Sequence, residues 1–278
     1  MENFTSPLQK YKRQPKLFID LPSKGAWYSP QVAEKFEELE VYSMSASDEI
    51  AVKTPDALIT GNAVVSIIQN CIPEIKNAWG VVAQDFEYLL AAIRIASYGD
   101  NMNVSHKCSK CGNEDNFGLP LQTLLDHLST VSPSYDVHIE GFTIRMRPLT
   151  YKETIENQLY TMKVRRELSQ TIKSIDDNEE RDKILNGIYE RINRQTEKII
   201  CEAILEISTP DGETENNPVF VKDFILNNEG KYFSAVQKQY AENNKQLAIP
   251  KTDVSCSECE NKDSIAPILD YSSFFLKP

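Results

Sequence analysis

The chain has 278 residues, of which 41% are hydrophobic and 26% are charged, as is ordinary for a soluble globular protein. Its net charge is −11, which has the wrong sign for a protein that neutralises the phosphates of a nucleic acid. No apolar run approaches the roughly 18 residues of a membrane span, and the polar, basic N-terminus lacks the apolar stretch of a secretory signal. We therefore expect a protein made in the cytosol that binds other proteins.

Residues 1–15 form a predicted basic arm, and an irregular segment, KLFIDLPSKGAWYSP (16–30), follows it. This segment carries Leu21, Pro22, Gly25 and the aromatic pair Trp27 and Tyr28. Such a loop either covers the core of its own domain or docks a partner, since exposed aromatic side chains anchor interfaces well. We name these five residues as candidates for partner docking.

The rest of the first half, residues 16–130, predicts a strand and then helices. ELEVYSM (38–44) alternates like a strand, and Ser45-x-x-Asp48 resembles a capping box that starts a helix. ALITGNAVVSIIQNCI reads as an apolar helix. QDFEYLLAAIRIASYG reads as a second helix, with one buried face that contains Phe86, Leu89, Leu90 and Ile93.

The second half, residues 131–278, repeats this order of elements. VHIEGFTIRMRPL predicts a hairpin that turns at Glu140–Gly141, and Thr150-x-x-Glu153 is a capping box. Two long helices are expected at 150–173 and 178–206, joined through the acidic segment 174–183. The second carries a near-heptad stripe that packs on its own core or on a partner helix, made of Leu185, Ile188, Ile192, Ile199 and Ala203. A helix that contains the dipeptide Asp-Phe, in VFVKDFILNN, follows, as QDFEYLL does in the first half.

Each half ends in a C-x-x-C phrase, CSKCGNED (108–115) and CSECENKD (256–263), identical at five of eight positions. In a reducing compartment, Cys108, Cys111, Cys256 and Cys259 at this spacing are typical of metal ligands. Four thiolates form a closed tetrahedral site that suits structural Zn²⁺, although iron uses the same ligands. Cys71 and Cys201 stand in apolar settings and are expected in the core.

The matching phrases and the matching order of elements predict an ancient duplication. The fold class that follows is α+β and mostly helical, with two repeated halves joined by a zinc-ribbon-like clasp of four cysteines. Apolar segments that contain proline, FGLPL and IAPIL, follow the two phrases.

The chain has no nucleotide-binding loop, no H-E-x-x-H motif and no G-x-S-x-G motif. Its three histidines are isolated, which leaves little material for general base catalysis near neutral pH. We expect neither an enzyme nor a small-molecule substrate. A hydrolase of cell-wall sugars would need two facing carboxylates in a cleft.

The segment from Leu21 to Gly25, with Tyr28, Met44 and Glu49, resembles the baseplate hub protein family of T-even-like contractile-tailed bacteriophages. The resemblance covers residues 16 to about 120; the second half has no copy of L-P-S-K-G. It implies a non-enzymatic protein that assembles or resides in the hub, with other hub or tail proteins as partners. Such a protein assembles in the host cytoplasm and belongs to the tail baseplate of the virion.

The alternative is a zinc-ribbon regulator that binds nucleic acid or a polymerase. A basic face beside the cysteines would favour it. The residues there are mixed and lean acidic, namely Lys107, Lys110, Glu114, Asp115, Glu258, Glu260 and Lys262.

Overall fold

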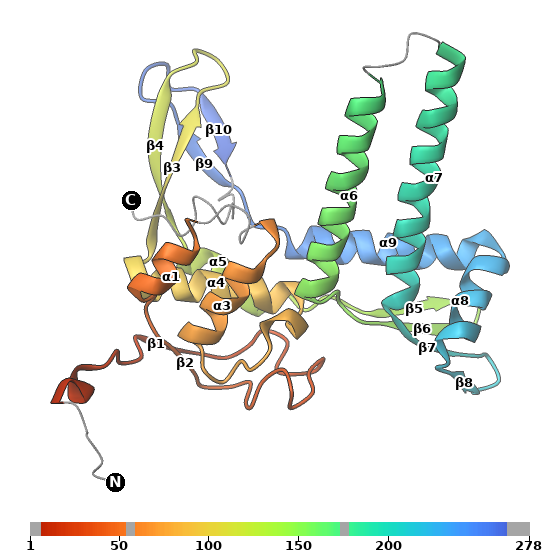
Figure 1. Cartoon of the computed structure of the whole chain (residues 1–278), viewed down its shortest axis with the longest axis horizontal. Coiled ribbons are helices and arrows are strands. Elements are labelled where there is room, and N and C mark those ends of the chain that lie inside the picture. The colour runs from red at the N-terminus through yellow and green to blue at the C-terminus, as the bar shows by residue number, and fades with distance from the viewer. Residues whose placement is uncertain (1–6, 54–58, 173–177, 266–278) are drawn as a thin grey trace. The chain divides into compact units, whose positions relative to one another are not determined.

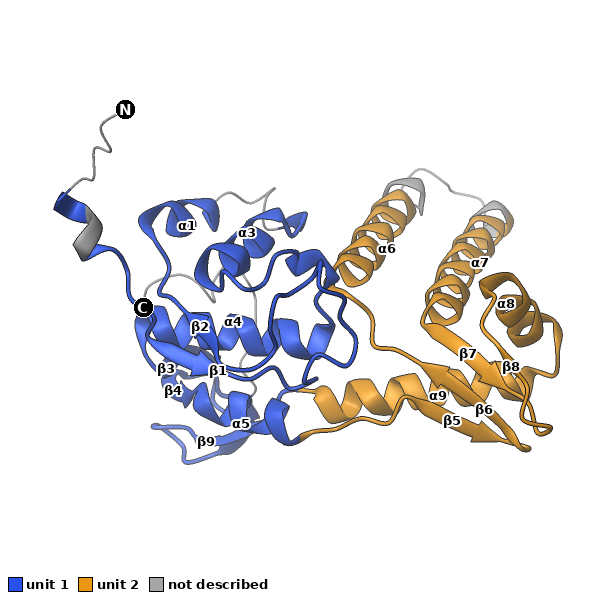
Figure 2. Cartoon of the chain, turned by 90° about the horizontal axis from the view of Figure 1, so that it is seen from below, with its two compact units in different colours: residues 1–130, 249–278 blue, residues 131–248 orange. Residues whose placement is uncertain are grey.

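The computed structural model describes residues 7–53, 59–172 and 178–265, and it divides into two compact units (Figures 1 and 2). Unit 1 combines residues 1–130 with 249–278, and unit 2 contains residues 131–248. The expected mixture of helices and strands is confirmed, with about 49% helix. Parts of five predicted features lie outside the described residues: the start of the arm, the first two residues of the helix ALITGNAVVSIIQNCI, the last residue of the helix predicted at 150–173, the 174–183 connection and most of IAPIL.

Unit 1 begins with a short 3-10 helix, η1 (Pro7–Tyr11), and a two-stranded antiparallel sheet of β1 (Leu17–Ile19) and β2 (Leu39–Val41). Arg13 joins the arm to the body of the unit, because its guanidinium donates to the carbonyls of Ser43 and Asn70. The same group lies 3.7 Å from the carboxylate of Asp48.

The described part of unit 1 contains four α-helices: α1 (Ala46–Ala51), α3 (Asn62–Cys71), α4 (Ala83–Tyr98) and α5 (Gln122–Thr130). The predicted Ser45–Asp48 capping box starts α1. The predicted face of α4 is confirmed, since Phe86, Leu89, Leu90 and Ile93 are each at most 1% exposed. The short 3-10 helix η2 (Ala78–Gly80) precedes α4, and Cys71 is buried as expected.

Two β-hairpins complete unit 1, and Figure 1 shows them side by side. The first pairs β3 (Asn101–Lys107) with β4 (Glu114–Pro120), and the second pairs β9 (Thr252–Ser255) with β10 (Lys262–Ile265). A small apolar cluster lies between the hairpins, formed by Leu119, Val254 and Ile265 with Val104 and Phe117 packed against it. The chain thus passes through all of unit 2 before it returns to unit 1.

Unit 2 contains a four-stranded antiparallel sheet in the order β5-β6-β7-β8, made of β5 (Asp136–Ile139), β6 (Phe142–Met146), β7 (Ile204–Ser208) and β8 (Thr214–Glu215). The predicted hairpin turn is confirmed, because Glu140 and Gly141 both have positive φ between β5 and β6. Helices α8 (Pro218–Asn227) and α9 (Gly230–Leu247) share an apolar core with the sheet, which includes Ile144, Ile207 and Val236.

The two long helices of unit 2 are α6 (Tyr151–Ile172) and α7 (Asn178–Glu202), which extend side by side away from the sheet (Figure 1). Helix α7 ends four residues earlier than the predicted limit of 206. The helix ends there because the next residues, ILEIS, form a strand in which Ile204 pairs with Met146 of the sheet. Ile188 and Ala203 of the predicted stripe are buried, and Leu185, Ile192 and Ile199 are partly buried.

The structure therefore groups residues 249–278 with the first part of the chain, whereas the second half predicted from the sequence is 131–278. Both cysteine phrases lie in unit 1. Outside these two phrases, the internal repeat stays a prediction.

Candidate metal centre

The sulfur atoms of Cys108, Cys111, Cys256 and Cys259 converge between the two hairpins of unit 1. All four lie within 4.8 Å of one another, and two pairs are closer: Cys108–Cys259 at 3.7 Å and Cys111–Cys256 at 3.6 Å. A disulfide needs an S–S distance of about 2.0 Å, and all four cysteines are free thiols. With a Zn–S bond of about 2.3 Å, the sulfurs of a regular tetrahedron are about 3.8 Å apart. The four thiols therefore fit a tetrahedral metal ion.

Each hairpin presents its sulfurs through the same tight turn, which we call a knuckle (residues 108–115 and 256–263). The amide of Cys108 donates to the carbonyl of Asn113 at 2.8 Å, and that of Cys256 donates to Asn261 at 2.9 Å. Gly112 and Glu260 occupy the same place in the two turns, with φ of 77° and 54°. Glycine adopts this conformation at little cost, whereas Glu260 is strained there.

Side chains of each knuckle bind the other knuckle in a reciprocal pattern. The amide and hydroxyl of Ser109 donate to the carboxylate of Asp263 at 3.0 and 2.6 Å. The amide and hydroxyl of Ser257 donate to Asp115 at the same two distances. The serine, asparagine and aspartate positions shared by the phrases thus hold the knuckles together about a pseudo-twofold axis.

The two aspartates that join the knuckles are held in the charged form. Hydrogen bonds from Ser109 and then from His106 place the pKa of Asp263 far below its usual range. Ser257 lowers the pKa of Asp115 in the same way. Backbone amides of residues 111 and 110 lower the pKa of the Cys108 thiol to about 6. A backbone amide opposes the shift at Cys111, but the neighbouring sulfurs and burial raise the pKa of that thiol to about 12.

Comparison with known proteins assigns the chain to a family. The sequence profile described as T4 bacteriophage base plate protein matches residues 18–276. The chain belongs to this baseplate protein family. Searches of curated proteins and of solved structures found no match to the chain. Membership supports a structural role in a phage baseplate and contacts with other tail proteins, and it does not favour the regulator alternative.

The loop that carries the family resemblance is fastened to the core of this baseplate protein by Asp85, which is fully buried at the start of α4. Asp85 accepts hydrogen bonds from the amide of Ser23 at 3.0 Å, from the hydroxyl of Ser23, and from the hydroxyl of Tyr28 at 2.6 Å. Burial raises the pKa of Asp85 above its usual value, and these hydrogen bonds oppose that rise.

Packing explains the other residues of the loop. Leu21 is 1% exposed, and Gly25 has a positive φ and lies so near Phe36 that a Cβ would be 2.3 Å from its ring. Trp27 and Pro22 are partly buried. The five docking candidates therefore divide into a buried member, Leu21, and four members at or near the surface.

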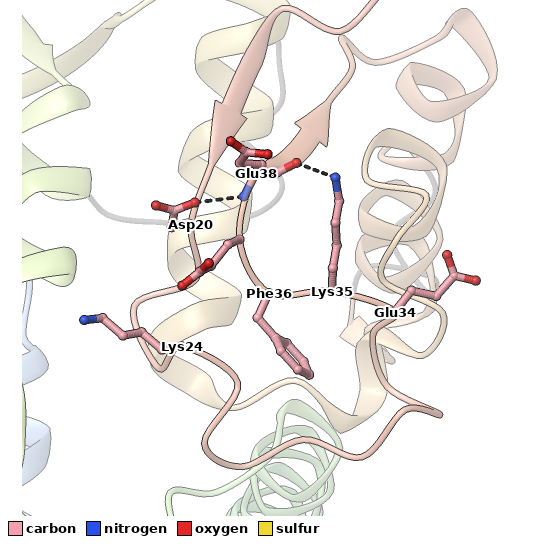
Figure 3. A pocket seen from close by; sticks show the side chains of 7 residues that line it. Asp20, Lys24, Glu34, Lys35, Phe36 and Glu38 are labelled. Carbon is pink, nitrogen blue, oxygen red and sulfur yellow. Dashed lines mark hydrogen bonds between the residues drawn. The ribbon is translucent and has the colours of Figure 1, made fainter.

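A shallow pocket of about 650 Å³ lies beside this loop (Figure 3), lined by Asp20, Lys24, Glu34, Lys35, Phe36, Glu37 and Glu38. Two of its charged side chains bind the backbone of Glu38. Lys35 Nζ donates to the carbonyl of Glu38 at 2.6 Å, and the amide of Glu38 donates to Asp20 at 2.8 Å. These bonds shape the segment between β1 and β2.

Sequence reasoning found the four cysteines but missed the residues that position them. Ser109, Asp115, Ser257 and Asp263 hold the knuckles together, and their identity in both phrases was the available signal. Asp85 carried no such signal, since it lies 62 residues from Ser23.

Among the described residues, none of the helices has the length and apolar character needed to span a membrane.

Proposed function

We propose that the chain is a structural protein of the tail baseplate hub that acts through contacts with other hub and tail proteins. The observation that carries this proposal is the family match over residues 18–276. The L-P-S-K-G resemblance supports the hub in particular. The protein would assemble with its partners in the host cytoplasm and take its place in the virion baseplate, and it would perform no catalysis.

The same proposal includes one structural Zn²⁺ per chain, bound by Cys108, Cys111, Cys256 and Cys259. The convergence of the four sulfurs within 4.8 Å, with two pairs at 3.6 and 3.7 Å, supports it. Four thiolates leave no open coordination position, so the ion would stabilise the fold and would not activate a substrate. Iron fits the same ligands, and metal analysis distinguishes the two.

Native mass spectrometry of the freshly purified, reduced chain tests the metal. We expect one zinc ion per chain in the wild type and none in the Cys256→Ser variant. Cys71→Ser is the matched control, because Cys71 is buried away from the cluster, and it is expected to retain the metal. A metal-free wild type would overturn the zinc proposal and leave the baseplate proposal unaffected.

For docking, we propose that the exposed side of the loop formed by residues 21–28 contacts a hub partner. Exposed and half-buried groups support this, because Lys24 and Ala26 are exposed and Trp27 is half-buried. Aromatic residues of this kind are frequent anchors of protein interfaces.

The docking test uses both tryptophans of the chain. Trp27→Ala is expected to weaken capture of purified hub proteins at least tenfold, whereas Trp79→Ala, at the half-buried tryptophan of η2, leaves capture unchanged. Equal capture by both variants would exclude the loop as the docking site. Failure of the wild type to associate with any hub or tail protein would overturn the hub proposal itself.

A further inference from the structure

The interface between the two knuckles has the form of an isologous dimer contact within one chain. Each knuckle donates from its serine and accepts on its aspartate. The asparagines repeat the pattern, since the Nδ2 of Asn113 donates to the hydroxyl of Ser257 and that of Asn261 donates to Ser109, both at 3.2 Å. A surface that carries both the donors and the acceptors of these serine, asparagine and aspartate bonds is complementary to a copy of itself.

From this symmetry, we propose that the first knuckle can pair with the first knuckle of a second copy of the chain. The four-thiolate site would then be formed by Cys108 and Cys111 of both copies, with one metal ion for two chains. This inference rests on the proposed metal site.

One asymmetry of the observed interface favours the first knuckle over the second for such pairing. His106 Nε2 lies 3.0 Å from the carboxylate of Asp263, and the ring of His106 packs near Phe117. In the second hairpin the position of His106 is occupied by Val254, so Asp115 has no equivalent bond. A pair of first knuckles places a histidine beside the aspartate on both sides, whereas a pair of second knuckles places none.

The intrachain site keeps an advantage in the wild type, because its two knuckles are linked and their effective concentration is high. The apolar cluster of Leu119, Val254 and Ile265 also belongs to the intrachain pair. Replacing Cys256 and Cys259 removes the four-thiolate site within one chain. Four thiolates can then bind zinc only between two copies of the chain.

The test is native mass spectrometry of the full-length double variant Cys256→Ser/Cys259→Ser, mixed in ¹⁴N and ¹⁵N forms with zinc. We expect mixed-isotope dimers with one zinc per two chains, which a chelator separates. Adding His106→Ala is expected to weaken the dimer at least tenfold. The converse variant, Cys108→Ser/Cys111→Ser, retains only the second knuckle and is expected to dimerise at least tenfold more weakly.

The outcomes separate the two proposals. A wild type without metal would overturn the zinc site. A wild type with one zinc per monomer, together with a double variant that stays monomeric, would overturn only the pairing between copies. If the double variant does not fold, as judged by circular dichroism, Cys256→Ala/Cys259→Ala takes its place, because it removes the same two thiols without adding hydroxyls. Mixed-isotope dimers of this variant with one zinc per two chains support the proposal, and exclusive monomers overturn it.

Discussion

Asp85 shows how one buried residue determines the shape of a surface loop. The hydroxyl of Tyr28 donates to Asp85 at 2.6 Å and accepts from the amide of Val82 at 3.1 Å, so it joins the loop to the start of α4. Burial, followed by the charge of Asp85, raises the pKa of Tyr28 far above its usual value. The tyrosine therefore stays protonated and remains a donor at any physiological pH.

Removing this hydroxyl is expected to destabilise unit 1. Tyr28→Phe leaves the buried amide of Val82 without its acceptor and removes one of the three donors to Asp85, which costs about 1–3 kcal/mol of unfolding free energy. Urea unfolding followed by tryptophan fluorescence measures it, because both tryptophans lie in unit 1. Tyr189→Phe is the control, since this side chain is 60% exposed and its loss is expected to change little. A cost equal to that of the control would show that the loop does not depend on the bond.

Gly25 is expected to be required for a steric reason as well as a conformational one. A Cβ at this position would lie 2.3 Å from the ring of Phe36, which packs on Tyr28. Gly25→Ala should therefore cost about 3 kcal/mol, the sum of left-handed strain and overpacking. Gly112→Ala is a matched control, because Gly112 has the same φ of 77° and its nearest neighbour is 3.5 Å away. Its cost, from strain alone, should be about 1–2 kcal/mol in the same urea titration.

At the scale of elements, short spacing rules predicted the starts of helices well. Ser45–Asp48 and Thr150–Glu153 both form capping boxes, because each depends on residues three positions apart. The predicted end of α7 was four residues too late, because the residues after Glu202 form β7 and pair with β6. Strand β6 lies more than 50 residues earlier in the chain. Local chemistry could be read from the sequence, whereas the competition between a helix and a distant strand could not.

The capping box of α6 makes the stability of unit 2 depend on pH. Burial alone would raise the pKa of Glu153, but bonds from Arg147, at 2.6 and 2.8 Å, and from Thr150 lower it to about 2 from 4.5. A pKa that folding lowers stabilises the protein above pH 4.5, and this contribution is lost as the pH falls towards 2. We expect it to be about 2–3 kcal/mol.

Glu153→Gln should therefore destabilise unit 2 at pH 7 and have progressively less effect towards pH 2. Urea titrations followed by circular dichroism at several pH values measure this difference. Glu156→Gln is the control, because the carboxylate of Glu156 is 61% exposed and lies 3.9 Å from Lys152. A difference between Glu153→Gln and the wild type that does not shrink with acid would exclude the ion pair as its source.

At the scale of the molecule, the cysteine spacing predicted that the four cysteine side chains come together. It did not predict which parts of the chain they link. Matching phrases indicated one site from residues more than 140 positions apart, and the sulfurs do converge. The path between them could not be predicted, because a long separation is compatible both with two joined halves and with an insertion. Unit 2 is an insertion in the sequence: its residues, 131–248, come between the two hairpins of unit 1 along the chain.

This arrangement predicts that metal removal acts on one unit alone. The second hairpin is held on the first by a small apolar cluster and the knuckle bonds, so a structural zinc, which contributes on the order of 10 kcal/mol in model peptides, should dominate its attachment. Hydrogen exchange should rise at least tenfold in β3, β4, β9 and β10 when a chelator is added. The rates in α6 and α7 should stay constant, because unit 2 has its own core and none of the four cysteines. Faster exchange in both units would mean that the metal supports the whole chain, and unchanged rates in the hairpins would mean that the serine–aspartate bonds suffice without it.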